Sequence, residues 1–417
     1  MPGALHHESI RELSQRIRSG AVSPVEVVGA FLARIAALQP KLNAFITVMG
    51  DVALKQAEVA AKEIRGGNWR GPLHGIPVGV KDFYDTAGVR TTAAFEAFKR
   101  RVPARDAVAV GALKRAGAII IGETNMHTLG MGTTGLVSAF GPARNPWNAD
   151  FIPGGSSSGS AASVASGMCP ATLDTDAVGS TRLPAACCGA VGFKGTYGRI
   201  STEGILAGEE DPGPFIRAMS HAAVTARTVE DAAIMFDVLA VTQVAEAITE
   251  DARGIRIGVG NNVNPAQVVR TAFEGAVAVF RDGGFAVSEV PVPFSGPAGG
   301  IANIEADRQT IGDRAFRDVD VILLPTLPTT VPTIEGVASN AEQGLSAEYT
   351  VFANHYGLPA ISVPCGFDAG GLPLGLQLVG RPGDEQAVLR AAHWYQGSTE
   401  KSLVRDPENQ GTLTKPS

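Results

Sequence analysis

The sequence predicts an α/β fold in which helices cover both faces of a sheet. A short apolar strand over Ile255–Val259, a helix over Pro265–Arg281 and a second strand over Phe285–Val290 follow one another. The same alternation occurs earlier, where a helix over Ala107–Ala116 precedes a buried strand over Ala118–Gly122. Strands and helices that alternate in this way are typical of sheets with a helical layer on each side.

The chain is expected to form one domain. No charged or low-complexity linker divides the 417 residues, and 45% of them are hydrophobic, which is enough for a large single core over residues 1–417. Helices over about residues 9–64 are expected to pack on that core. Two of them begin with Ser-x-x-Glu capping boxes, at Ser9 and Ser23. The second should run to about Leu38 and stop at Pro40.

Composition argues against several classes of function. The formal net charge is −6, which leaves no basic footprint for nucleic-acid binding. The four cysteines form no Cys-x-x-Cys motif, so free thiols in a reducing cytosol are expected. The N-terminus has no apolar signal region, and no apolar run approaches the roughly 20 residues of a membrane span. We therefore expect a cytoplasmic protein that binds neither nucleic acid nor membranes.

Small residues are concentrated between positions 153 and 182. The run Gly154–Ser160 leads into the helix-forming residues Ala161–Gly167, and a second small-residue turn follows at Asp176–Ser180. A Gly-rich turn that feeds a helix leaves backbone N–H groups free for an anion or a developing oxyanion. A flexible linker fits poorly, because an apolar helix follows directly. No Gly-Lys-Ser/Thr ending indicates a phosphate loop, and neither Ser156 nor Ser180 lies in a Gly-x-Ser-x-Gly elbow.

Three segments together resemble a known signature. They are Gly75-Ile76-Pro77-Val78-Gly79-Val80-Lys81-Asp82, Gly154–Ser160, and the stretch from Thr175-Asp176 through Gly179-Ser180 to Arg182-Leu183-Pro184-Ala185. In these segments the chain is similar to the amidase signature family, the Ser–cis-Ser–Lys amide hydrolases, and the 24 positions between Ser156 and Ser180 match the family's separation. The resemblance extends from about Ser9 to about Gln396. It implies an α/β fold with a large, mixed, mostly parallel sheet flanked by helices on both faces.

The resemblance also implies a catalytic triad. Ser180 would be the nucleophile. Ser156, following a cis peptide bond, would pass the Ser180 proton onward and return it to the leaving nitrogen, and Lys81 would be the final base. Without the resemblance, Lys81 reads as an edge-strand lysine with its tip in water. As a base it has to be neutral, which burial favours.

Further roles follow from the same resemblance. The oxyanion hole would consist of the backbone N–H groups of Ala177, Val178, Gly179 and Ser180. The supporting residues would be Ser157, Thr175, Asp176 and Arg182. The backbone near Gly130 and Met131 would line the acyl pocket.

The sequence departs from the family's pattern in three places. Val178 stands where relatives typically have glycine, so it is strained if the position needs a positive φ and otherwise narrows the pocket. His127 follows Asn125-Met126, where the family often has Asp or Pro, and we expect it to be a structural or pocket-wall histidine rather than a general base. The stretch between about Pro293 and Asp318 is shorter than usual, which would leave the pocket open.

The main hypothesis is an amidohydrolase that cleaves a linear carboxamide or an N-substituted amide and releases ammonia or an amine. Two alternatives stay open: a glutaminase-type amidotransferase subunit that works with a partner protein, and a catalytically silent ligand-binding homologue. The implied chemistry uses no metal and no organic cofactor. A small-molecule amide substrate is expected, and a homodimer is the base-rate expectation.

Overall fold

The computed structural model describes residues 5–209, 211, 213–294, 300–338 and 344–399. Within these ranges, 11 strands form one sheet in the order β1-β3-β2-β4-β6-β5-β10-β11-β9-β7-β8. The strands are β1 (Phe45–Val48), β2 (Pro77–Lys81), β3 (Ile119–Thr124), β4 (Ala171–Asp176), β5 (Val191–Lys194), β6 (His221–Ala226), β7 (Ile257–Gly260), β8 (Val287–Val290), β9 (Val321–Pro325), β10 (Ala360–Phe367) and β11 (Pro373–Gly380).

The α-helices are α1 (Ile10–Arg18), α2 (Pro24–Leu42), α3 (Gly50–Arg65), α4 (Val108–Arg115), α5 (Ser158–Ala165), α6 (Arg182–Cys188), α7 (Pro214–Met219), α8 (Val229–Ala240), α9 (Val244–Ala247), α10 (Gln267–Asp282), α11 (Ile304–Ala315), α12 (Ile334–Ala338), α13 (Val351–His355) and α14 (Glu385–Ser398). Short 3-10 helices are η1 (Leu5–His7), η2 (Glu96–Phe98), η3 (Thr128–Gly130) and η4 (Gly300–Asn303). In the described part of the chain, no helix is both long and apolar enough to cross a bilayer.

The α/β class and the mixed sheet are confirmed, but the expectation of a mostly parallel sheet is wrong. Among the described strands, β2 pairs in parallel with β3 and β4, and β7 pairs in parallel with β8 and β9. The other six pairings are antiparallel. The connection between β10 and β11 shows one reason, because residues 368–372 are too few for a crossover and permit only a hairpin.

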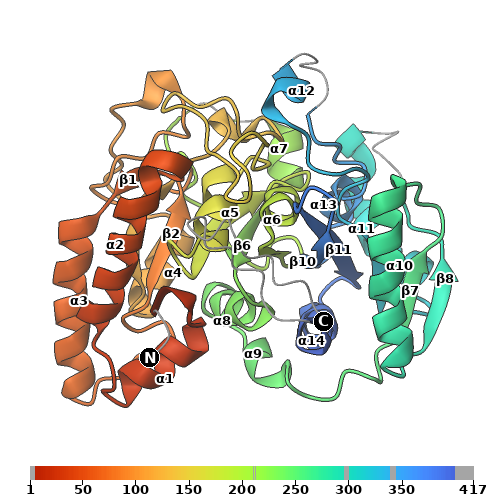
Figure 1. Cartoon of the computed structure of the whole chain (residues 1–417), viewed down its shortest axis with the longest axis horizontal. Coiled ribbons are helices and arrows are strands. Elements are labelled where there is room, and N and C mark those ends of the chain that lie inside the picture. The colour runs from red at the N-terminus through yellow and green to blue at the C-terminus, as the bar shows by residue number, and fades with distance from the viewer. Residues whose placement is uncertain (1–4, 210, 212, 295–299, 339–343, 400–417) are drawn as a thin grey trace.

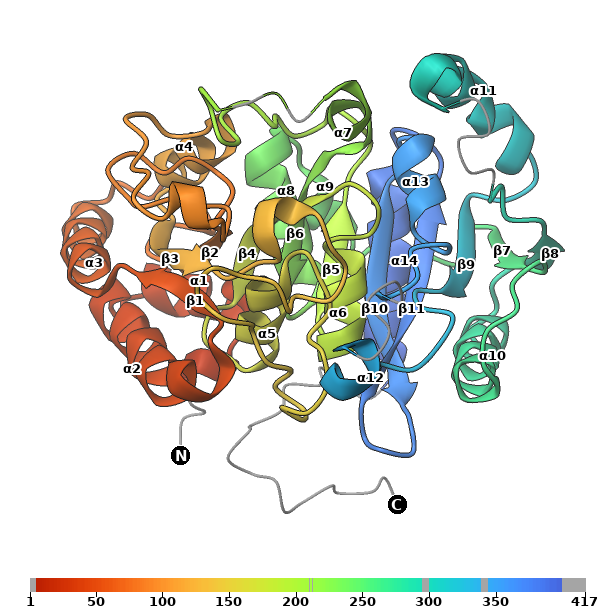
Figure 2. The same cartoon turned by 90° about the horizontal axis from the view of Figure 1, so that it is seen from above.

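Helices lie on both sides of the sheet. Figure 1 shows α8, α9 and α14 below the central strands and α5 and α6 above them. Seen from above, the strands follow one another across the molecule from β1 and β3 at one side to β7 and β8 at the other (Figure 2). The largest buried hydrophobic cluster includes Phe31 of α2, Phe193 of β5 and Phe280 of α10. The N-terminal helices therefore bury their apolar faces in the same cluster as the sheet.

Helix starts follow the sequence signals in α1 and α2, but the end of α2 does not. Both predicted capping boxes are present, from Ser9 to Glu12 and from Ser23 to Glu26. However, α2 does not stop before Pro40 but continues to Leu42, with Asn43 in the left-handed conformation at its end. Pro40 and the residue four positions before it are both at least partly exposed, so the carbonyl that loses its helical N–H partner lies towards solvent. The four cysteines are free, as expected.

Candidate active site

Lys81 lies inside the sheet rather than at its edge. It is the last residue of β2, which lies between β3 and β4, and every residue of this strand is buried. A nearly continuous apolar run such as Val78 to Val80 is typical of a strand covered on both faces. The alternative of a solvent-exposed edge-strand lysine is therefore wrong, because the side chain of Lys81 has no exposed surface.

The amine of Lys81 contacts two hydroxyl groups. Nζ lies 2.7 Å from Ser156 Oγ and 2.8 Å from Thr175 Oγ1. Burial lowers the pKa of Lys81 to about 8, although the negative charges of Asp174 and Asp176 act in the opposite direction. A substantial fraction of this amine is therefore neutral near pH 8, which is the state that accepts a proton.

The Gly/Ser run brings Ser156 to Lys81. The peptide bond between Gly155 and Ser156 is cis, the conformation that the family resemblance implies. Gly155 is tightly enclosed, since a side-chain carbon at this position would lie 2.9 Å from Gly132 O. Ser157 precedes α5, and its backbone N–H donates to Ser180 O at 3.1 Å. This bond joins the Ser156 loop to the turn that carries Ser180.

The Ser180 turn connects β4 to α6 and is organised by a buried carboxylate. Asp176 accepts hydrogen bonds from the backbone N–H groups of Gly179 at 2.8 Å and Thr181 at 3.2 Å. It also pairs with Arg182, whose Nε and Nη2 lie 3.0 and 2.9 Å away. Burial raises the pKa of Asp176, but the charge and hydrogen bonds of Arg182 outweigh that effect and hold the pKa below its ordinary value. Asp176 is therefore ionised, and its hydrogen bonds hold the turn in place.

The hydroxyl of Ser180 lies in this turn without a protein partner. In the described ranges, no hydrogen bond joins Ser180 Oγ to another residue, although the residue is only 4% exposed. The backbone N–H groups of Ala177, Val178 and Ser180 are likewise without a described partner. The expectation that Gly179 also donates to an oxyanion does not hold in this structure, because Asp176 occupies its N–H.

The structure separates the two interpretations of Val178. Gly179, not Val178, has a positive φ, at 129°. Val178 is therefore unstrained, and its β-branched side chain is half-buried two residues before Ser180. The remaining interpretation is that Val178 narrows the space available to a substrate.

Gly130 lies next to Ser156, whereas the side chain of Met131 faces outward. A side-chain carbon on Gly130 would lie 3.7 Å from Ser156 Oγ, while Met131 is 68% exposed. Close by, the backbone N–H of His127 donates to Ser156 O at 2.9 Å. Burial and the charge of Lys81 lower the pKa of His127, which favours a neutral ring.

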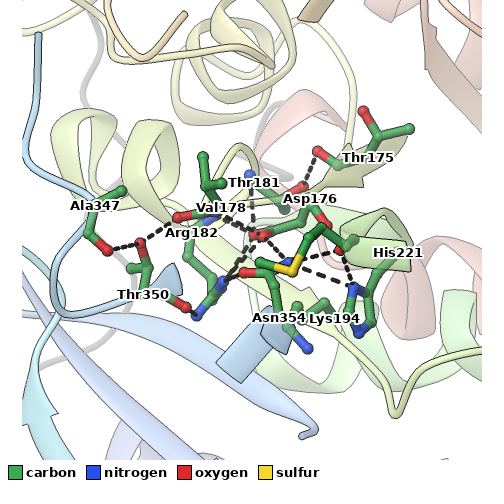
Figure 3. Close-up of polar contacts among 12 residues, drawn as sticks. Thr175, Asp176, Val178, Thr181, Arg182, Lys194, His221, Ala347, Thr350 and Asn354 are labelled. Atoms are coloured by element: carbon green, nitrogen blue, oxygen red, sulfur yellow. Dashed lines mark hydrogen bonds and ion pairs between the residues drawn. The ribbon is translucent and has the colours of Figure 1, made fainter. Parts of the chain in front are cut away.

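Several residues at the site carry no sequence signal. Arg182 donates to Thr350 O at 3.0 Å, to Gln377 Oε1 at 2.6 Å and to Asn354 Oδ1 at 2.6 Å. Figure 3 shows Thr350 and Asn354 facing the Asp176–Arg182 pair from α13 and the residue before it. Their positions lie 168 and 172 residues from Arg182, so no local pattern identifies them. Asp82 is different, because it belongs to the motif Gly75–Asp82. It accepts hydrogen bonds from the backbone N–H groups of Thr92 at 2.9 Å and Ala94 at 3.1 Å.

No metal centre is evident in the part of the chain that is described, since it contains no group of three or more His, Cys, Asp or Glu side chains arranged to hold an ion.

Comparison with known proteins identifies the family. A family model described as Amidase matches residues 26–297 and 302–389. The chain belongs to the amidase signature family.

Members of the amidase signature family resemble this chain over nearly its whole length. A Glutamyl-tRNA(Gln) amidotransferase subunit from Roseiflexus sp. (strain RS-1) is 36% identical over 483 residues, covering 95% of this chain and 97% of the relative. The native peptide amidase from Stenotrophomonas maltophilia has a TM-score of 0.82 and 26% identity, covering 97% of this chain and 99% of that one. The corresponding Glutamyl-tRNA(Gln) amidotransferase subunit from Thermotoga maritima has a TM-score of 0.78 and 27% identity, covering 98% of both chains.

The alignment with the Roseiflexus relative is longer than the 417 residues of this chain, so that relative contains segments without a counterpart here. The family match is interrupted between residues 297 and 302. This gap lies within the stretch between about Pro293 and Asp318, which was expected to be shorter than usual. Residues 295–299 of that stretch lie outside the described residues.

Proposed function

We propose that this chain hydrolyses a carboxamide through an acyl-enzyme on Ser180, with Ser156 and Lys81 completing the triad. The observation that carries the proposal is the 2.7 Å contact between Lys81 Nζ and Ser156 Oγ, which lies beside the turn of Ser180. Because burial lowers the pKa of Lys81 to about 8, this contact offers a proton acceptor without a histidine.

The proposed reaction begins when Ser180 Oγ attacks the carbonyl carbon of the amide. The Ser180 proton passes to Ser156 Oγ, which gives its own proton to neutral Lys81. The N–H groups of Ala177, Val178 and Ser180 are available to stabilise the oxyanion. When the C–N bond breaks, the proton returns through Ser156 to the leaving nitrogen, and ammonia or an amine departs. Water then attacks the Ser180 ester by the same proton path and releases the acid.

The relatives favour glutamine as the amide. Curated relatives at 33–36% identity share one name, that of the same Glutamyl-tRNA(Gln) amidotransferase subunit. We therefore place the glutaminase-type subunit first and infer a protein partner that uses the ammonia in the cytoplasm. The stand-alone amidase is the second candidate, supported by the TM-score of 0.82 with a peptide amidase. A homodimer and a single domain over residues 1–417 remain part of the proposal.

Ammonia release from glutamine, from other primary carboxamides and from N-substituted amides tests both candidates. We expect Ser180→Ala to lower turnover by at least about 10³-fold, because the nucleophile is lost. Ser19→Ala, which alters an exposed serine just after α1, is the matched control and should remain fully active. Preference for glutamine, increased by a co-purifying partner, supports the glutaminase-type subunit, and preference for an N-substituted amide supports the stand-alone amidase. Undiminished turnover by Ser180→Ala contradicts the assigned nucleophile, and tight ligand binding without turnover identifies a silent homologue.

A further inference from the structure

The peptide group between Val178 and Gly179 is held from both sides. Its carbonyl oxygen accepts a hydrogen bond from Thr350 Oγ1 at 2.5 Å, and its N–H donates to Asp176 Oδ1 at 2.8 Å. The C=O and N–H of a trans peptide point in opposite directions, so these two contacts together fix the rotation of the peptide plane. Figure 3 shows Thr350 on one side of the turn and Asp176 on the other.

Thr350 is itself firmly placed. The residue is fully buried and immediately precedes α13. Its backbone N–H donates to Ala347 O at 2.9 Å, and its carbonyl accepts from Arg182 Nη1 at 3.0 Å. Its side chain packs closely against Gly179, because a side-chain carbon at that position would lie 2.9 Å from Thr350 Cβ. The hydroxyl of Thr350 therefore reaches Val178 O from a fixed position.

The held peptide group lies one peptide before Ser180, the proposed nucleophile. If it rotated, Gly179 N–H would leave Asp176, and the N–H and Cα of Ser180 would move with it. The three N–H groups that are available to an oxyanion belong to the same turn, so their placement depends on this peptide. A displacement of about 1 Å at a reacting group costs on the order of 10²-fold in rate.

We propose that Thr350 is a positioning residue that sets the orientation of the Val178–Gly179 peptide and thereby of Ser180 and the oxyanion donors. This inference rests on the proposed function of Ser180 as the nucleophile. Thr350 acts through the backbone of the turn and does not take part in proton transfer. Its hydroxyl, rather than its bulk, carries the effect.

Two variants separate the hydroxyl from the bulk of the side chain. Thr350→Val keeps the shape and removes the donor to Val178 O, whereas Thr350→Ser keeps the donor and removes a methyl group. Thr271→Val is the matched control, because this exposed threonine donates only within α10, to Gln267 O at 3.0 Å. Asn354 is less suitable for the test, since its Nδ2 also holds Asp176 Oδ1 at 2.9 Å within the buried ion pair.

The measurement is the rate of covalent labelling by a fluorophosphonate serine probe, resolved into the saturating rate and the probe concentration at half-saturation. We expect Thr350→Val to lower the saturating rate by about 10²-fold and to change the half-saturating concentration by less than about twofold, because positioning rather than binding is lost. Thr350→Ser should label within about threefold of the wild type, and Thr271→Val should match the wild type. Melting curves of all variants should agree closely.

Equal labelling of Thr350→Val and wild type overturns the inference while leaving the proposed function intact. A changed half-saturating concentration with an unchanged saturating rate also overturns it, since Thr350 then acts on binding. An equal loss in the Val and Ser variants, with lowered melting temperatures, shows a purely structural role and overturns it as well. If well-folded wild type does not react at all, the proposed function fails, and the positioning role fails with it.

Discussion

Lys81 illustrates how one residue depends on its surroundings. The motif that contains it predicts a strand, but a strand alone does not indicate whether the lysine tip reaches water. In the structure β2 lies between β3 and β4, so the lysine tip does not reach water. Burial lowers the pKa of Lys81 to about 8. The negative charges of Asp174 and Asp176 limit that shift, so the pKa of the amine stays close to the pH at which proton transfer is useful.

Activity is therefore expected to rise with pH as Lys81 loses its proton. Because the neutral amine is the base, kcat/KM should increase about tenfold per pH unit below pH 8 and level off above it. The pH profile of ammonia release between pH 6 and 10 measures this directly. Lys62→Ala, an exposed lysine on α3, should keep the same profile. A wild-type profile that is flat through pH 8 would show that Lys81 is not the titrating base.

The three residues of the proposed triad were named from the family resemblance, whereas the residues that hold them in place were only partly predicted from the sequence. Ser156, Ser180 and Lys81 lie in the three motifs that carry the resemblance to the amidase signature family, and their proposed roles come from that resemblance. Thr350 and Asn354 donate hydrogen bonds to a turn 172 and 178 positions earlier, and neither has a distinctive neighbourhood in the sequence. The sequence also did not indicate that Gly179 N–H donates to Asp176, because this bond depends on which side of the peptide faces the carboxylate.

Among elements, helices with strong end signals were predicted best. The capping boxes of α1 and α2 were predicted from the sequence, because a side chain and a backbone group three residues apart determine them. Strands β1, β4 and β6 were not predicted. β4 reads Ala-Thr-Leu-Asp-Thr-Asp and buries two carboxylates, so its polar residues hide the apolar pattern of a core strand.

The end of α8 holds a backbone conformation that a valine adopts poorly. Val241 has φ 54° and ψ 57°, which is a strained conformation for valine. The residue is 90% exposed, so burial of its side chain does little to offset that strain. Val241→Gly should raise the free energy of unfolding by about 1 kcal/mol, because glycine adopts this conformation without a steric penalty. Chemical denaturation measures the change.

Val268→Gly provides the comparison for that prediction. Val268 is also exposed, but it lies within α10 and is not among the residues with a positive φ. Glycine there should lower the free energy of unfolding by about 0.5–1 kcal/mol. If both glycine variants are destabilised equally, the left-handed conformation of Val241 carries no cost.

At the scale of the whole molecule, the sheet is what assembles the site. Lys81 and Ser156 are 75 positions apart, and Lys81 and Thr175 are 94 apart, yet all three meet where β2 and β4 end side by side. The family resemblance predicted this convergence and the mixed α/β fold. It did not predict the excess of antiparallel pairings, because strand direction depends on connections such as the β10–β11 hairpin, which are not part of the signature.

The central claim is that these distant residues form one activated serine. Intact-mass analysis after treatment with a fluorophosphonate probe tests it most directly on wild type, Ser180→Ala and Lys81→Ala. We predict a single adduct on wild type, mapped by peptide analysis to Ser180, none on Ser180→Ala, and labelling slowed by at least about 10²-fold in Lys81→Ala. An adduct that persists in Ser180→Ala, or no adduct on well-folded wild type, would contradict the account.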